Sequence, residues 1–160
     1  MDRSGTARAP EPPRLWTVAE ANGRIAGLDE LLPRLRGWVR RLREVHEETH
    51  RLSGFWGKDV DAPDHADHAL KQRLDAEWQN LTRRLEEAVA GLRREGIEIK
   101  ELESGLVDFY SLQDGEVVFL CWQRGESSVG FYHLLTGGFR NRRPISGAPR
   151  RTPASAQGPP

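Results

Sequence analysis

Two short stretches of the sequence contain residue types that could do chemistry, and the longer of them is FLCWQRGESSVGFYH. It places Cys121, Glu126 and His133 close together among aromatic residues. A thiolate, a carboxylate and an imidazole are ligand types that Zn²⁺ accepts in proteins, and a free thiol is also open to redox chemistry. The interpretation that we favour is a β-hairpin whose packing residues only resemble a reactive site, with Cys121 as a small buried apolar residue.

The second stretch is HEETH, which runs from His46 to His50 and matches the H-E-x-x-H pattern. Residues four apart share one face of a helix, so both imidazoles could bind Zn²⁺ while Glu47 activates a bound water. His65 and His68 follow the next turn, and an antiparallel hairpin could bring one of them near. The simpler interpretation, which we favour, is a group of solvated histidines near helix ends.

The segment that would position these histidines, residues 17–95, is predicted to form a helical hairpin. Thr17 and Glu20 have the spacing of a capping box. Apolar residues then recur at steps of three and four, as on one face of a helix. A second helix is expected from about Asp64 to Gly96, and two such helices joined by a short loop pack antiparallel.

The helical pattern is interrupted at two places in its first part. Asn22-Gly23 and Pro33 both weaken a helix, because glycine is flexible and proline lacks a backbone N–H. We therefore expect a break or kink, with a short helix before a long one that starts near Leu32.

From Ile97 onward the period of the apolar residues falls from about 3.6 to about 2, which indicates strands. The runs GLVDFYSL, EVVFLCWQ and SVGFYHLL predict three strands within residues 97–135, and Ile97 to Lys100 adds an edge strand. Asp114-Gly115 is a two-residue hairpin turn. The fold class is therefore α+β, a long antiparallel helical hairpin followed by a three- to four-stranded antiparallel β-meander.

Turn geometry decides which residues share a face of this sheet. The first turn places Asp108 opposite Cys121. A two-residue turn at Gly125-Glu126 would place Cys121 opposite Gly130. His133 would then lie on the other face, where it could not share a metal ion with Cys121. A three-residue loop would reverse that parity.

With the two-residue turn, Gly130 leaves space beside Cys121 that polar groups surround. The candidate ligand niche consists of Asp108, Tyr110, Cys121, Arg124, Glu126, Gly130 and Tyr132. The simpler interpretation, which we favour, is that Gly130 only relieves crowding near an aromatic side chain or a partner backbone.

The strand VVFLCW has no polar alternation, which is typical of a strand covered on both faces. One helical hairpin covers only one face of a sheet well. We therefore expect a second copy of the chain to cover the face that carries Cys121, which gives a homodimer.

Composition and the chain ends limit the class of function. Lys plus Arg and Asp plus Glu both number 24, so nothing in the overall charge points to nucleic acid or an anionic membrane as partner. No apolar run approaches membrane-spanning length, and Cys121 is the one cysteine, so a cytoplasmic location is expected. Residues 15–143 are expected to form a single domain between disordered tails at 1–14 and 144–160, and the basic C-terminal tail is interpreted as solvated.

Several short motifs stand in an order that resembles a known family. They are Ile99-Lys100, Gly105 to Phe109, Leu120 to Trp122, Gly125-Glu126, Tyr132-His133 and Gly138-Phe139. Together with WTVAEAN and LLPRL near the start, they resemble the uncharacterised conserved family of bacteria and archaea called domain of unknown function 2203. The resemblance implies the hairpin-plus-sheet fold and no known activity. The HEETH segment lies outside the family's pattern.

We therefore expect an uncharacterised cytoplasmic protein that is a non-enzymatic, dimeric interaction module or small-ligand-binding module without a cofactor. The alternative is a metal-binding protein, or a small metal-dependent hydrolase, that holds Zn²⁺ at the HEETH segment.

Overall fold

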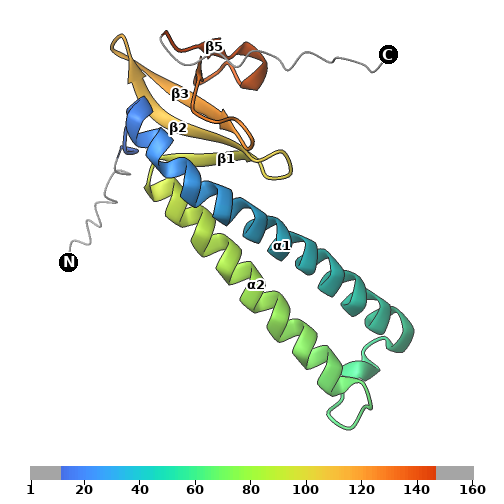
Figure 1. The fold of residues 1–160 in the computed structure, drawn as a ribbon. Helices are drawn as coiled ribbons and strands as arrows, with labels where there is room; N and C mark the ends of the chain where they lie inside the picture. Colours follow the sequence, from blue (N-terminus) through green and yellow to red (C-terminus); the bar gives the residue numbers. More distant parts are fainter. Residues whose placement is uncertain (1–11, 147–160) are drawn as a thin grey trace, which may run out of the picture.

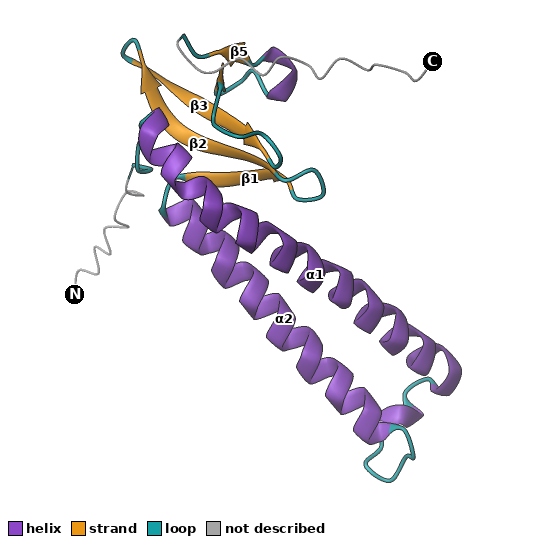
Figure 2. Ribbon diagram, viewed as in Figure 1, coloured by secondary structure: helices purple, strands orange, loops and turns teal. Residues whose placement is uncertain are grey.

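The computed structural model describes residues 12–146 and shows a long helical hairpin with an antiparallel sheet packed across its base (Figure 1). The elements in chain order are α1 (Val18–Trp56), η1 (Asp59–Asp61), α2 (His68–Arg94), β1 (Ile97–Glu101), β2 (Leu106–Gln113), β3 (Glu116–Gln123), β4 (Phe131–Leu134), η2 (Phe139–Asn141) and β5 (Arg143–Pro144). The start of α1 lies against the sheet, and the rest of the two long helices extends away from it (Figure 2). The predicted α+β class, a helical hairpin followed by an antiparallel meander, is confirmed.

The first helix begins at the predicted capping box. The Thr17 N–H donates to Glu20 Oε2 at 2.8 Å, and the Glu20 N–H donates to Thr17 Oγ1 at 3.2 Å. Both bonds satisfy amides that the first helical turn leaves without a partner. The helix start was therefore predictable from local residues alone.

The predicted break, with a separate short helix before Leu32, is wrong, because α1 continues from Val18 to Trp56 through Pro33, and the kink expected as the other possibility stays a prediction. A proline inside a helix costs about 3 kcal/mol. Three leucines that flank it, Leu28, Leu32 and Leu35, are completely buried. Full burial of one such side chain contributes roughly 1.5–3 kcal/mol, so the packing of the three outweighs the proline.

The sheet is a meander in the order β1-β2-β3-β4-β5, with every neighbouring pair antiparallel. The turn at Asp114-Gly115 is confirmed, since both residues have positive φ, 51° and 83°, as a two-residue hairpin turn requires. The predicted pairing of Asp108 with Cys121 follows from it and is also confirmed.

The described residues extend past both predicted ends of the domain. Of the two predicted tails, residues 1–11 and 147–160 lie outside the described part of the chain, and nothing in the structure tests them. Pro144, placed in the tail by the sequence analysis, pairs with Phe131 as part of β5. The next residue, Ile145, packs against the core.

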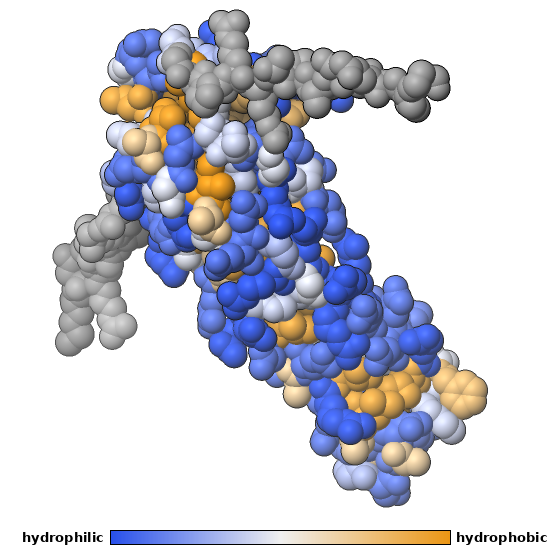
Figure 3. Space-filling view, in the orientation of Figure 1, coloured by the Kyte–Doolittle hydropathy of each residue, from blue (hydrophilic) through white to orange (hydrophobic). Residues whose placement is uncertain are grey.

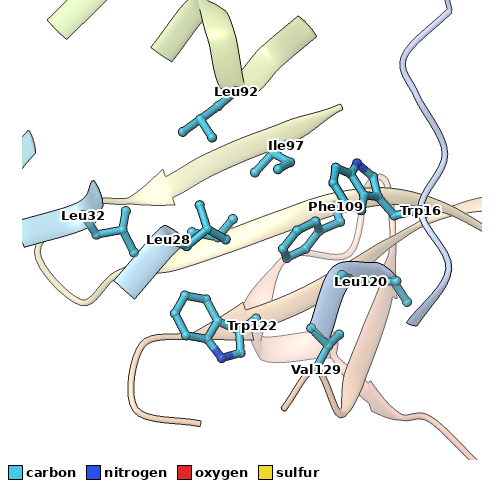
Figure 4. Close-up of a cluster of buried hydrophobic side chains, with 11 residues drawn as sticks. Trp16, Leu28, Leu32, Leu92, Ile97, Phe109, Leu120, Trp122 and Val129 are labelled. Atoms are coloured by element: carbon cyan, nitrogen blue, oxygen red, sulfur yellow. The ribbon is translucent and has the colours of Figure 1, made fainter. Parts of the chain in front are cut away.

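One face of the sheet packs on the base of the hairpin and forms the core (Figure 4). The buried core residues are Trp16, Ala21, Leu28, Leu32, Leu92, Ile97, Val107, Phe109, Leu120, Trp122 and Val129. Trp16 connects the two parts: its ring contacts Phe109 edge-on at 5.5 Å between centroids, and its Nε1–H donates to the Glu95 carbonyl at 2.6 Å. The predicted apolar face of β2 and β3 is the one that meets the helices.

The hairpin extends well beyond the sheet, and the face seen in Figure 3 is mostly hydrophilic, with a few apolar side chains midway and a larger apolar patch near its far end. Neither helix in residues 12–146 has an apolar stretch long enough to span a bilayer.

Candidate metal centre

The register between β3 and β4 is one residue away from the predicted register. Cys121 pairs with Phe131 instead of Gly130, and Phe119 pairs with His133. Residues directly opposite on antiparallel strands point to the same face, and side chains alternate along each strand. His133 therefore lies on the face that carries Cys121, and the expectation that these two residues cannot share a metal ion is wrong.

The register shifts because the connection after β3 makes its hydrogen bonds elsewhere. The Gln123 N–H donates to Glu126 Oε2 at 2.9 Å, which holds the start of the loop in a turn. The Val129 N–H donates to the side-chain oxygen of Asn22 in α1 at 2.7 Å. Val129 is thus bound to the helix, and pairing with β3 resumes only at Phe131.

The observed register brings Asp108, Cys121 and His133 together on the adjacent strands β2, β3 and β4. One possible ligand atom from each lies within 4.8 Å of the other two. The three residues are 1%, 0% and 3% exposed. Within residues 12–146, this is the one group of three or more His, Cys, Asp or Glu side chains close enough to hold a metal ion.

The hydrogen bonds of His133 orient its ring toward the other two residues. Nδ1 lies 2.8 Å from the carbonyl oxygen of Leu134, and a carbonyl only accepts, so Nδ1 carries a proton. Nε2 lies 3.1 Å from Asp108 Oδ2. In proteins, a metal-binding histidine usually donates its second ring N–H to a carbonyl or carboxylate in this way, which directs the other nitrogen at the metal.

Asp108 is a carboxylic acid in a site where a negative charge is costly. Burial raises its pKa, against the opposing effect of the neighbouring charges of His133 and Lys100. Its Oδ1 atom is buried and has no hydrogen-bond partner by distance and angle within the described residues, and the weak thiol donor of Cys121 is the one other buried side chain that interacts with this carboxyl group beside His133. A buried carboxyl oxygen without a partner costs about 1–3 kcal/mol, and a cation bound to this atom would offset that cost.

Cys121 is equally unsuited to carry a charge in the absence of a cation. Burial, followed by the negative charge of Asp108, raises the pKa of the thiol to about 12. Nucleophilic cysteines instead have a lowered pKa. The thiol is therefore inert as a nucleophile, whereas a divalent cation beside it would stabilise the thiolate.

Two cationic side chains border the trio. Lys100 Nζ lies 4.0 Å from Asp108 Oδ2 and 4.3 Å from the centroid of the Phe119 ring. The guanidinium of Arg142 stacks on Phe131, the residue paired with Cys121, at 4.2 Å from its centroid. Arg142 also forms an ion pair with Glu126 at 3.0 Å, so the predicted niche residue Glu126 lies at the edge of this centre.

The other predicted niche residues have separate positions. The Tyr110 hydroxyl donates to a β1 glutamate at 2.6 Å, and Arg124 pairs with an α1 aspartate at 3.2 Å. Tyr132 packs against the core instead of facing Cys121. Gly130 is not opposite Cys121, and its carbonyl accepts the backbone N–H of Ile145. Of the predicted niche residues, Asp108 and Cys121 lie together, and the third member of their group is His133, which was not in the predicted niche.

The four histidines proposed as metal ligands near HEETH are not brought together as a group. His46 and His50 are exposed, with ring centroids 6.3 Å apart. His65 accepts a backbone N–H of its own loop, and His68 contacts a carbonyl oxygen of η1 at 3.2 Å. Each histidine therefore has a local partner or faces solvent.

A model of the family described as Uncharacterized conserved protein (DUF2203) matches residues 14–145, which is most of the chain. The chain belongs to this family. No curated protein and no solved structure matches it. The DUF2203 match spans the hairpin and the whole sheet, so all three residues of the centre lie within it.

Sequence reasoning had named every member of the centre but had excluded His133 from it. Asp108, Cys121 and His133 each lie in one of the short motifs that resemble DUF2203. They come together because the β3–β4 connection is longer than a two-residue turn, which reverses the parity of the last strand.

Proposed function

We propose that this DUF2203 domain binds a divalent transition-metal ion, of the class of Zn²⁺, through Asp108, Cys121 and His133 Nε2. The observation that carries the proposal is the buried Oδ1 of Asp108, which has no partner in residues 12–146 and lies beside a thiol and an oriented imidazole. A cation would satisfy that oxygen and stabilise both acidic groups in one step.

The spacing of the ligand atoms supports an ion of this size. Zn–N and Zn–O bonds are about 2.0–2.2 Å long, so two such ligands of a tetrahedral ion lie roughly 3.3 Å apart. His133 Nε2 and Asp108 Oδ2 are 3.1 Å apart, which is a hydrogen-bond distance, so an ion bound at Nε2 would replace this contact and could bind the carboxylate through Oδ1 or Oδ2. The sulfur lies within 4.8 Å of both, so a side-chain adjustment could bring all three atoms onto one ion.

The ligand types favour zinc-class ions over the common hard cations. Thiolate and imidazole suit Zn²⁺, Co²⁺ and related metals, whereas Mg²⁺ and Ca²⁺ take oxygen ligands. Three protein ligands leave one position of a tetrahedral ion to another molecule. This supports the small-ligand-binding module expected from the sequence.

A binding role fits the centre better than catalysis by the protein's own groups. The raised pKa of Cys121 disfavours a nucleophilic thiolate. In the proposed centre the metal ion takes Nε2 of His133, and Nδ1 donates to the Leu134 carbonyl, so neither ring nitrogen is left to act as a general base toward a further group. We place the protein in the cytoplasm, because a single reduced cysteine is typical of a reducing compartment.

Isothermal titration of tag-free, chelator-stripped protein with ZnCl₂ tests the proposal. We expect one ion per chain, and the variants Cys121→Ser and His133→Gln should each weaken binding by about 100-fold or more. The variant His46→Gln/His50→Gln is the matched control, and it should bind like the parent. Binding that disappears in this control and persists in Cys121→Ser would move the site to HEETH and overturn the proposal.

A further inference from the structure

The far end of the helical hairpin carries a second feature, an open apolar groove between the end of α1 and the start of α2. Its volume is about 400 Å³. The groove is lined by Glu48, Arg51, Leu52, Phe55, Trp56, Leu70 and Leu74. It belongs to the apolar patch near the far end of the hairpin (Figure 3).

An aromatic side chain projects beside the groove. Phe55 is 78% exposed, the highest exposure among the large apolar residues that the structure describes, and its ring contacts Trp56 edge-on at 4.7 Å. Trp78 is 41% exposed and continues the row of Leu70 and Leu74 at four-residue steps, on the same face of α2. Exposed aromatic residues in a cluster are typical of interface centres.

The rim of the groove carries one acidic and one basic residue, so it can pair with the same rim of a second copy. Glu48 and Arg51 both line the groove, three residues apart on α1. In a two-fold symmetric contact, residue i of the first copy contacts residue j of the second, and residue j of the first copy contacts residue i of the second. A second copy therefore places its basic residue against the acidic one and its acidic residue against the basic one. A strongly acidic or strongly basic partner would leave one of the two opposed by a like charge.

We propose that this groove, defined by its seven lining residues, is a self-association site in which Phe55 of each copy enters the groove of the other. A second copy supplies what this groove needs from a partner: an exposed aromatic side chain, Phe55, to fill it, and one acidic and one basic residue, Glu48 and Arg51, to face its rim. This relocates the homodimer expected from the sequence. Phe119 and Cys121, on the face expected to need a partner, are 4% and 0% exposed in one chain.

The association is independent of the metal centre. The groove lies at the end of the hairpin near η1, whereas the centre lies in the sheet at the base of the hairpin (Figure 1). Zinc should therefore leave the self-association unchanged, and groove variants should bind zinc like the parent. The two proposals can fail separately.

Sedimentation velocity over about 5–500 µM tests the site. The parent should pass from monomer to dimer, and Phe55→Ser should weaken the dimer by at least about 30-fold. Leu112→Ser, which removes an exposed apolar side chain of the sheet, is the matched control and should dimerise like the parent. Unchanged helix content by circular dichroism establishes that each variant is folded.

A charge-swap experiment identifies the occupant as a second copy. Arg51→Glu makes the rim acidic and Glu48→Arg makes it basic, so each variant alone should associate more weakly than the parent. Glu48 also pairs with Arg41 of its own chain at 3.1 Å, so the melting temperature of Glu48→Arg must be measured alongside. An equimolar mixture of the two variants should associate more strongly than either one. A parent that stays monomeric at 500 µM, or a Phe55→Ser variant with parental affinity, would overturn the proposal.

Discussion

His133 Nε2 lies 3.1 Å from Asp108 Oδ2, and both side chains are almost completely buried. The two residues are 25 positions apart in the sequence and meet only because β4 pairs with β3 in one particular register. Each residue therefore lowers the free-energy cost of burying the other, and removing one leaves the other buried without its partner.

The first prediction concerns the stability of the metal-free protein. His133→Ala leaves Asp108 buried without its partner, so the free energy of unfolding should fall by about 3–5 kcal/mol. Adding Asp108→Leu should recover part of the loss, because the unpaired carboxyl is then gone. Urea denaturation of both variants measures the difference. A double variant less stable than His133→Ala would show that the carboxyl is not the source of the cost.

The second prediction concerns the reactivity of Cys121 in the metal-free protein. Its pKa of about 12 and its complete burial leave very little accessible thiolate at pH 8. Reaction with a disulfide reagent should therefore be slow, and its rate should keep rising with pH beyond the pH at which an ordinary thiol levels off. The unfolded protein in guanidinium chloride is the control and should react within seconds. Equal rates in both states would contradict the assigned environment.

The third prediction connects α1 to the metal centre. Asn22→Ala removes the acceptor of the Val129 N–H and leaves a buried amide unpaired, which should cost about 1–3 kcal/mol. Because that bond fixes where pairing with β4 resumes, zinc affinity should fall by about 10-fold as well. Asn141→Ala, which removes an exposed amide, is the control for both measurements. If stability falls while zinc affinity is unchanged, the hydrogen bond between Asn22 and Val129 does not position the metal ligands.

The fourth prediction concerns the junction between α2 and β1. Gly96 has φ +72°, and a Cβ there would lie 2.2 Å from the backbone oxygen of Arg14. Gly96→Ala should therefore destabilise the protein by more than about 1 kcal/mol, the usual cost of a side chain in the left-handed region. Gly37→Ala in the interior of α1 meets no atom within 4 Å and should stabilise by up to about 1 kcal/mol. Thermal unfolding of the pair gives the comparison, and equal melting temperatures would contradict it.

Local signals predicted much of the fold. The Thr17 cap, the Gly96 stop and the Asp114-Gly115 turn each act through neighbouring residues, and each is present as predicted. The pairing of Asp108 with Cys121, two thirds of the candidate centre, follows from that turn.

The remaining features depend on contacts between distant residues. The continuity of α1 through Pro33 depends on leucines that are buried only in the folded protein. The place of His133 depends on Asn22 binding the Val129 amide, 107 positions along the chain. A hydrogen bond between residues so far apart leaves no pattern in the sequence of the last strand. The face of the sheet on which His133 lies could therefore not be derived from the loop sequence.

Co²⁺ titration followed by absorbance tests the central claim most directly, because thiolate coordination and ligand geometry each leave a spectroscopic signature. The metal-stripped parent should gain an intense near-ultraviolet thiolate-to-cobalt band and visible bands of a four-coordinate ion, saturating at one ion per chain. Cys121→Ser should lose the thiolate band, and addition of Zn²⁺ should displace the cobalt. A parent that develops no thiolate band at saturating Co²⁺, while His46→Gln/His50→Gln removes whatever binding remains, would contradict a metal centre at Asp108, Cys121 and His133.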